Sequence, residues 1–502
     1  MTRHPQASRN RAAVARADAA AVLLRWLFLA TLTAALLAAA AAHARPAPDS
    51  FADLADKLLP AVVNVSTTQK ADKDSTTGGN GGGDEDLDQF FKDFFDKQNR
   101  PAQPRRAMSL GSGFIIDAAG YIVTNNHVIA DAEEIKVRLH DDTELKATVV
   151  GRDEKTDLAL LKVESKTPLP ALKWGDSDQA RIGDWVLAIG NPFGLGGSVT
   201  AGILSARQRD INAGPYDDFL QTDASINRGN SGGPMFNVDG EVIGINTAIF
   251  SPSGGSVGIG FAIPSNLARN VIDQLRQYGH PRRGWLGVRI QSVTDELAEG
   301  LHLANTHGAL VANVTDGGPA AKAGIQQGDV VIRFDGRTVD EMRKLPRMVA
   351  ETPIEKQVDV VVWRKGKEMS FKVTLGELDE TETAAAAPAE EAPKPAAKPK
   401  SSKVELLGMT LSEITAALRK QYELGDDASG VVVTEVKADS AAAEKGMAAG
   451  DLIVEVDQKS VGKPEEIDKQ VKDAKTNGYR VVTLLVFRQG DYRWVALRID
   501  QG

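Results

Sequence analysis

Between residues 109 and 263 the chain alternates short apolar runs with turn residues. The runs are rich in Val, Ile and Leu, and Gly, Asp and Asn separate them, which is typical of strands in an all-β domain. A further run at 61–66 precedes this region. The pattern predicts two six-stranded antiparallel barrels. The clearest predicted strands lie at 113–117, 134–139, 144–151, 157–163, 184–189, 202–206 and 241–248.

Two segments with helical spacing flank this region. Residues 50–59 place apolar side chains on one helix face, with Ser50 as the predicted N-cap and Pro60 as the stop. Residues 265–278 form a second amphipathic segment, which we predict to close a domain spanning residues 45–280. The apolar face of that segment consists of Leu267, Val271, Ile272 and Leu275.

One pattern occurs twice in the C-terminal part of the chain: a strand, a short helix, a Gly-Asp turn and another strand. The two copies occupy 308–335 and 430–457. We therefore predict two related α+β domains, at 282–378 and 404–500. The segment 379–403 between them is rich in Ala, Pro, Glu and Lys, which cannot bury a core, so it is predicted to be a linker.

The first 44 residues have the composition of an export signal. A basic region precedes an apolar run at 26–42, and small residues end the segment, so cleavage is predicted before Arg45. An uncleaved membrane anchor is the alternative, although the run is short for a spanning helix. Residues 69–107 combine glycine clusters, acidic residues and four phenylalanines, and we predict a flexible loop there.

Composition excludes several classes of function. The chain has 502 residues, no cysteine and a formal net charge of −9. Disulfides and cysteine-ligated zinc are therefore excluded, and nucleic acid is not expected as the partner of so acidic a chain. His302 and His307 lack metal-ligand spacing, and the glycine clusters lack the strand-then-helix context of a phosphate loop. No metal and no cofactor are predicted.

The candidate chemistry centres on Ser231, which lies between glycines in the stretch 227–234. The main-chain N–H groups of Gly229 and Ser231 can then point to one place, as an oxyanion hole requires. His127 ends an apolar run, and Asp157 begins another. Each residue alone is weak evidence, and Ser231 could be the spacer of a tight turn. Together they predict a catalytic triad in the order His, Asp, Ser.

Five segments carry a resemblance to a known family: TNNHVI, TDLALLKV, NRGNSGGP, GINTAI and GIGFAIP. They resemble the HtrA (Do-like) family of bacterial periplasmic serine endopeptidases, and the similarity extends from about residue 50 to the C-terminus. The resemblance implies a mostly β chain, with a chymotrypsin-like double six-stranded β-barrel followed by two PDZ-like α+β domains. It also implies an ATP-independent enzyme that degrades unfolded or misfolded exported proteins in periplasmic quality control, and that assembles as a homo-trimer or a larger oligomer.

The resemblance also suggests binding residues. Substrate is expected to contact Asn230. The stretch Asn246, Thr247, Ala248 and Ile249 is expected to line the primary specificity pocket or to pair with the substrate main chain as a β-strand, with core packing as the alternative for Ile249. A small aliphatic residue is expected before the scissile bond. Peptide C-termini are expected at the carboxylate-binding loops of the PDZ-like domains. These loops are Leu286-Gly287-Val288 in the first domain and the less typical Leu407-Gly408-Met409 in the second. A purely structural or assembly role remains the alternative for the second loop. For the whole protein, the alternative is a holdase chaperone or a PDZ scaffold with little proteolysis.

Overall fold

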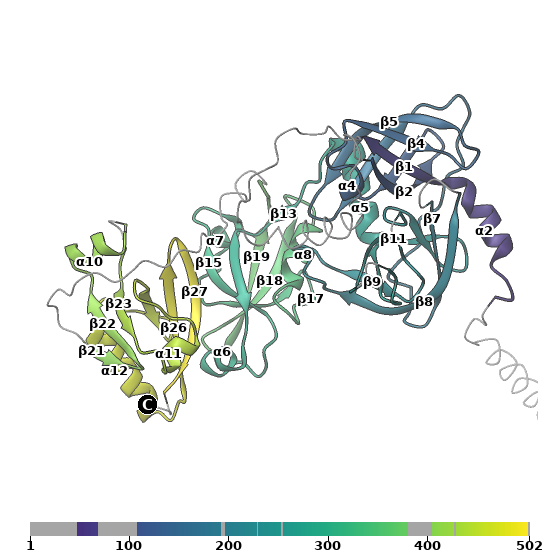
Figure 1. Cartoon of the computed structure of the whole chain (residues 1–502). Helices are drawn as coiled ribbons and strands as arrows, with labels where there is room; N and C mark the ends of the chain where they lie inside the picture. Colours follow the sequence, from purple (N-terminus) through teal and green to yellow (C-terminus); the bar gives the residue numbers. More distant parts are fainter. Residues whose placement is uncertain are drawn as a thin grey trace, which may run out of the picture. The chain divides into compact units, whose positions relative to one another are not determined.

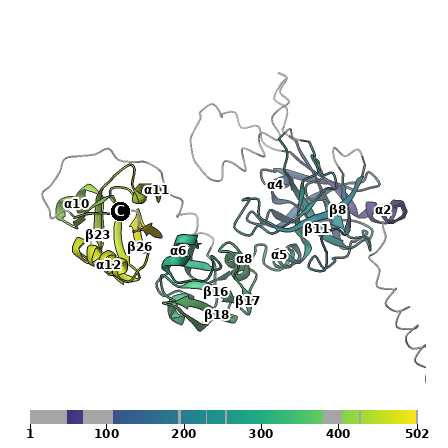
Figure 2. The same cartoon turned by 90° about the horizontal axis from the view of Figure 1, so that it is seen from below.

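A computed structural model describes residues 48–68, 108–191, 196–227, 229–252, 255–379, 404–425 and 428–499. It divides into two compact units, Met1–Lys57 and Leu58–Gly502. Figure 1 and Figure 2 give two views of the chain. The predicted signal segment 1–44 and the predicted loop 69–107 lie outside the described residues, as does the linker from residue 380 onward.

The predicted N-terminal helix is present but shorter than expected. Helix α2 spans Ala52–Leu58, and the hydroxyl of Ser50 accepts a hydrogen bond from the Ala52 N–H at 3.1 Å. Pro60 does not end the helix directly. It lies in a short 3-10 turn, Leu59–Ala61, whose first positions tolerate proline because they need no N–H partner. The following strand consequently begins at Val62.

The first barrel closes in the order β1-β2-β3-β6-β5-β4. Its inward residues, such as Val63, Ile115, Ile122 and Leu161, are fully buried and form one cluster. Between β3 and β4 lies the single-turn helix α4, Asn126–Ile129. The strands are β1 (Val62–Thr68), β2 (Met108–Asp117), β3 (Tyr121–Thr124), β4 (Glu134–Arg138), β5 (Glu144–Asp153) and β6 (Leu158–Val163).

The second barrel closes in the order β10-β11-β12-β9-β8-β7, which confirms the prediction of two six-stranded barrels. Helix α5 (Ser265–Tyr278) has the predicted bounds and packs against β5, β6 and β11, so it contacts both barrels (Figure 1). The strands are β7 (Trp185–Gly190), β8 (Ser198–Arg209), β9 (Phe219–Thr222), β10 (Pro234–Phe236), β11 (Val242–Ile249) and β12 (Gly260–Pro264).

The first PDZ-like domain has a sheet in the order β14-β15-β16-β18-β19, with β17 beside β16 and a separate pair β13-β20. Figure 2 labels three of its strands, β16, β17 and β18, and the helices α6 and α8. The strands are β13 (Gly284–Trp285), β14 (Val288–Ser292), β15 (Ala309–Val314), β16 (Val330–Phe334), β17 (Arg337–Thr338), β18 (Gln357–Arg364), β19 (Lys367–Thr374) and β20 (Gly376–Glu377). The helices are α6 (Asp295–Gly300), α7 (Pro319–Ala323) and α8 (Lys344–Ala350).

The second PDZ-like domain has the order β21-β22-β23-β24-β26-β27, with β25 beside β24. The strands are β21 (Val404–Leu406), β22 (Met409–Glu413), β23 (Val431–Val436), β24 (Leu452–Val456), β25 (Lys459–Ser460), β26 (Val481–Arg488) and β27 (Asp491–Arg498). The helices are α10 (Ala416–Gln421), α11 (Ala441–Glu444) and α12 (Pro464–Thr476).

The Gly-Asp turn has the same function in both copies of the repeat. Asp329 and Asp451 are each 1% exposed. Each carboxylate caps its own turn by accepting a main-chain N–H and also pairs with an arginine, Arg364 in the first copy and Arg488 in the second. A buried carboxylate needs such partners, because desolvation without them is costly. The repeated sequence therefore encodes a repeated electrostatic contact.

Candidate active site

The structure joins His127 directly to Asp157. The Nδ1 atom of His127 lies 2.7 Å from Oδ2 of Asp157, and the His127 main-chain N–H donates to Oδ1 at 2.9 Å. His127 is in α4 and Asp157 directly precedes β6, so both belong to the first barrel, as the sequence predicts. Two contacts to one carboxylate fix the imidazole in both position and orientation, which is the task of the acid in a Ser-His-Asp triad.

Asp157 is held by its main chain as well as by its carboxylate. Its carbonyl oxygen accepts hydrogen bonds from the Asn126 N–H at 3.1 Å and from the Asn125 side-chain amide at 2.8 Å. The residue has a φ of 55°, a left-handed conformation that aspartate tolerates better than most residues. Sequence reasoning assigned no role to Asn125 or Asn126, although both directly precede His127.

The second barrel reaches the same carboxylate through Thr247 of β11. The Thr247 hydroxyl donates to Oδ2 of Asp157 at 2.7 Å, and the Thr247 carbonyl accepts the Ser231 hydroxyl at 3.4 Å. Residues from the two barrels therefore form one network that contains His127, Asp157 and Ser231. Thr247 was predicted to contact substrate, but its hydroxyl is committed to Asp157.

The loop that carries Ser231 is tightly constrained. The N–H of Gly232 donates to the Asn246 carbonyl and the N–H of Asn246 donates to the Gly233 carbonyl, both at 2.8 Å. Gly229 and Gly232 have φ values of 93° and 84°, which only glycine adopts without strain. Glycine at these positions is therefore required by the backbone, and this explains the unusual composition of the motif.

Most of the predicted substrate-contact side chains are buried. Asn230 and Asn246 are 3% and 0% exposed, and the Asn246 amide donates to the Pro234 carbonyl at 3.2 Å. Ile249 belongs to the core of the second barrel. The geometry therefore does not support substrate contacts by these side chains. Ala248 is half-buried, and a contact of its side chain with substrate stays a prediction.

The main chain of β11 offers a better candidate contact. Strand β10 pairs with β11 only as far as Ile245, and Asn246 bonds to the Ser231 loop. From Thr247 to Ile249 no described strand pairs with that side of β11. An extended peptide could add to this edge as a further strand.

The loop 286–288 of the first PDZ-like domain leads into an open sheet edge. Leu286 is buried and its carbonyl accepts the Ala320 N–H at 2.9 Å. Gly287 has a φ of 78° and its carbonyl accepts the Thr315 N–H at 2.9 Å. Val288 then begins β14, the outermost strand, whose free side pairs with no other described strand. This arrangement leaves room for strand addition by a peptide.

The loop 407–409 of the second domain differs in this respect. Leu407 and Gly408 have φ values of 52° and 79°, and Leu406 pairs with Met409. These two residues are thus the centre of a tight hairpin turn that folds β21 onto β22. The strand edge that is open in the first domain is covered here by the chain itself. A peptide could add to β22 on that side only if β21 were displaced.

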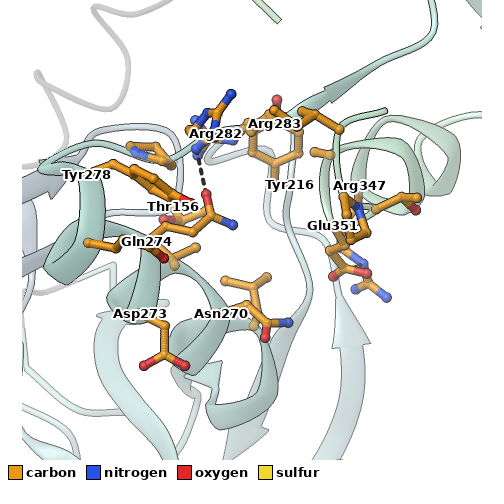
Figure 3. A pocket seen from close by; sticks show the side chains of 18 residues that line it. Thr156, Tyr216, Asn270, Asp273, Gln274, Tyr278, Arg282, Arg283, Arg347 and Glu351 are labelled. Carbon is orange, nitrogen blue, oxygen red and sulfur yellow. Dashed lines mark hydrogen bonds and ion pairs between the residues drawn. The ribbon is translucent and has the colours of Figure 1, made fainter. Parts of the chain in front are cut away.

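A separate cavity of about 340 Å³ lies beside helix α5 (Figure 3). Its lining includes Gln274, whose side-chain oxygen accepts the main-chain N–H of Arg282 at 2.5 Å. It also includes Glu351, whose Oε1 atom lies 3.3 Å from Nε of Arg347. Burial raises the pKa of Glu351, and Arg347 partly offsets that effect. The cavity contains neither His127 nor Ser231. The candidate active site is therefore elsewhere.

Two negative findings apply to the part of the chain that the structure describes. No group of three or more His, Asp or Glu side chains there is arranged to hold a metal ion. No helix there is long and apolar enough to cross a membrane.

Comparisons with known proteins identify the domains and the family of the chain. The family model for the trypsin-like peptidase domain matches residues 111–245, and PDZ domain models match 284–375 and 397–487. A protein named probable periplasmic serine endoprotease DegP-like from Brucella suis biovar 1 (strain 1330) is 43% identical over 488 residues, which cover 92% of each chain. A protein of the same name from Rickettsia conorii (strain ATCC VR-613 / Malish 7) is 42% identical, covering 90% of this chain and 89% of the relative.

Solved structures of HtrA-type proteases are also similar to this chain. The HtrA-type protease AlgW with a tripeptide is 42% identical, with a TM-score of 0.54 over 66% of this chain and 98% of that one. The same protease with a decapeptide is 42% identical, with a TM-score of 0.53 over 66% of this chain and 99% of that one. The fold and the matched domains define a trypsin-like serine endopeptidase that carries two PDZ domains. More specifically, the chain belongs to the DegP-like, HtrA-type family of serine endoproteases.

Proposed function

We propose that His127, Asp157 and Ser231 are the catalytic triad and that the main-chain N–H groups of Gly229 and Ser231 form the oxyanion hole. The proposal rests on the hydrogen bonds of the Asp157 carboxylate. It binds His127 of the first barrel and accepts a hydrogen bond from the Thr247 hydroxyl of the second. Because the Thr247 carbonyl also accepts the Ser231 hydroxyl, the nucleophile belongs to the same network.

The proposed roles define the reaction. His127 removes the hydroxyl proton as Ser231 Oγ attacks the peptide carbonyl, and Asp157 stabilises the imidazolium that forms. The two N–H groups hold the negative oxygen of the tetrahedral intermediate, and mutagenesis elsewhere assigns about 3–4 kcal/mol to one such donor. His127 then protonates the leaving amine. Water hydrolyses the acyl-enzyme through the same base and releases Ser231.

The substrate class is an unfolded or misfolded polypeptide, cleaved without ATP. Substrate would add as a strand to the unpaired side of residues 247–249 of β11, and only an extended chain can do so. The open edge of β14 would hold a peptide C-terminus at Leu286-Gly287-Val288. The AlgW structures, which contain a tripeptide or a decapeptide, support peptide binding by this chain.

The cellular setting and the assembly are part of the same proposal. The relatives are named periplasmic, and the predicted signal segment 1–44 suits export to that compartment. We infer that the enzyme serves protein quality control there as a homo-trimer, alone or within larger oligomers. Light scattering coupled to size-exclusion chromatography measures this directly, and a monomer at micromolar concentration would contradict the assembly.

The decisive assay uses one protein in two states. Wild type and Ser231→Ala are incubated without ATP with native α-lactalbumin and with its reduced, permanently unfolded form. We expect wild type to cleave the unfolded form, to leave the native form intact, and Ser231→Ala to cleave neither. If both proteins prevent aggregation of the unfolded form and neither cleaves it, the holdase alternative is correct.

A further inference from the structure

Ser112 connects the two halves of the candidate active site, although no sequence motif assigned it a role. It lies within β2 and is 0% exposed. Its main-chain N–H donates to the carbonyl of Ser231 at 2.8 Å, and its main-chain carbonyl accepts the hydroxyl of Thr124 at 2.7 Å. Thr124 ends β3, three residues before His127. The main chain of Ser112 therefore contacts the nucleophile and the strand that leads to the base.

The side chain of Ser112 makes two further hydrogen bonds. Its hydroxyl donates to the Gly229 carbonyl at 2.5 Å and accepts the Asn191 main-chain N–H at 2.7 Å. A buried hydroxyl has one proton to donate, and here that proton is used on the loop that carries Ser231. Because the Asn191 N–H is itself a donor, the hydroxyl proton cannot be directed toward Asn191. The hydroxyl therefore donates to the Gly229 carbonyl.

The position of this hydrogen bond along the loop is important. The peptide unit that contains the Gly229 carbonyl lies between the N–H of Gly229 and the N–H of Ser231. A change in the Gly229 ψ or the Asn230 φ torsion that the other does not compensate alters the angle between the two N–H groups. Gly229, with a φ of 93°, cannot resist such a rotation through a side chain of its own, because glycine is the most permissive residue. The restraint must come from neighbours. The Asn227 carbonyl accepts the Asn230 N–H of this unit at 3.0 Å, and the Ser112 hydroxyl binds its carbonyl.

We propose that Ser112 is a positioning residue of the oxyanion hole: its hydroxyl holds the Gly229–Asn230 peptide unit so that both N–H groups face the developing oxyanion. The inference rests on the proposed roles of Gly229 and Ser231. It assigns Ser112 no contact with substrate. Its effect is expected on the transition state rather than on substrate binding, because the oxyanion exists only after attack.

The test compares two buried serines of the same domain. Ser265, 1% exposed, is a matched control because its hydroxyl also donates to a glycine carbonyl, that of Gly175 at 2.8 Å, and accepts a main-chain N–H, that of Ser177 at 3.2 Å. Ser112→Ala and Ser265→Ala therefore remove the same chemistry, once at the oxyanion loop and once away from it. Hydrolysis of a chromogenic peptide gives kcat and KM, and a peptide boronic acid serves as the tetrahedral transition-state analogue.

We expect Ser112→Ala to lower kcat by about 10- to 100-fold with KM changed less than about twofold, since removal of a whole oxyanion donor costs 100-fold or more. Its affinity for the boronic acid should fall by the same factor as kcat/KM. Ser265→Ala should retain wild-type values. Ser112→Cys keeps a weaker donor and should give an intermediate kcat. It carries the test if Ser112→Ala does not fold.

Three outcomes would overturn the proposal. They are equal kcat in Ser112→Ala and Ser265→Ala, an unchanged boronic acid affinity in Ser112→Ala, and wild-type kcat with wild-type boronic acid affinity in Ser112→Cys. Failure of the proposed catalytic site is distinguishable from these, because the wild-type protein would then neither hydrolyse the peptide nor bind the boronic acid.

Discussion

Replacing Gly232 with alanine should disable the active site through a steric effect that can be worked from the structure. A Cβ atom at this position would lie well inside van der Waals contact of the Ser112 carbonyl oxygen and the Thr124 hydroxyl, and 3.0 Å from the Asn125 nitrogen. These atoms belong to buried residues of the first barrel that cannot move aside cheaply. The Ser231 loop must therefore shift away from the barrel.

Two energy terms contribute to the cost of Gly232→Ala. The φ of 84° costs a residue with a side chain about 1–2 kcal/mol, and forcing a methyl group into a packed site costs about 1–3 kcal/mol more. For a domain of this size each kcal/mol lowers Tm by about 2–4 °C. Because a displacement of about 1 Å at a catalytic group costs about 100-fold in rate, we expect kcat/KM to fall at least that much.

Gly183→Ala is the control that separates the two terms. Gly183 has a φ of 95°, but an added Cβ would meet no atom within 4 Å. Gly183→Ala should therefore cost only the free energy of the left-handed backbone conformation and keep nearly wild-type activity. Differential scanning calorimetry and hydrolysis of a chromogenic peptide measure both variants. Equal losses in Tm and in kcat/KM for Gly232→Ala and Gly183→Ala would refute the steric argument.

Three further predictions concern the surroundings of Asp157 and the stability of the first barrel. Thr247→Val removes one of the donors to the Asp157 carboxylate, a bond to a charged group worth about 1.5–3 kcal/mol. We expect kcat to fall about 10-fold at constant KM, and an unchanged kcat would show that His127 alone is sufficient to hold the Asp157 carboxylate. Asp153→Asn removes the negative charge that pairs with the buried Arg283. We expect the free energy of unfolding, measured in a denaturant titration, to fall by about 3 kcal/mol or more. A change below about 1 kcal/mol would contradict this prediction. The Ala119 N–H, and then Arg276, lower the pKa of Asp117. The ionised carboxylate therefore stabilises the fold at pH values above its unfolded pKa, and this stabilisation is lost as the pH falls through its folded pKa. We expect the Tm of Asp117→Asn to be below that of wild type at pH 7 and to converge with it at acidic pH. A Tm difference that does not change with pH would exclude ionisation of Asp117 as its cause.

The sequence predicted the barrels, the closing helix and the repeat because each depends on local patterns. Val/Ile-rich strands and helical spacing are properties of consecutive residues, so they can be read without coordinates. Strand β10 was not predicted because it has only three residues, Pro234–Phe236, and its pairing with β7 and β11 is decided by the barrel. Local propensity gives no signal for such a strand.

The candidate site divides in the same way. The proposed triad could be inferred from three short motifs. The hydrogen-bond partners of those residues could not, because these bonds join segments far apart in the chain. Ser112 bonds to Gly229 and Asn191, and Thr247 bonds to Asp157 across the two barrels. The burial of Asn246 was also not predicted, because an asparagine in a motif near the nucleophile looks the same whether it faces substrate or the core. In the second PDZ-like domain, the pairing of β21 with β22 depends on the turn at Leu407 and Gly408, for which the sequence left both peptide binding and a structural role open.

The most direct test of the account is labelling of the wild-type protein with a fluorophosphonate, followed by peptide mass spectrometry. A fluorophosphonate reacts only with a serine that a neighbouring base activates and an oxyanion hole stabilises. We predict one modified residue, Ser231, with labelling strongly slowed in His127→Ala and in Asp157→Asn. Labelling at another serine, or labelling of Ser231 at an unchanged rate in His127→Ala, would contradict the central claim that these three residues act together.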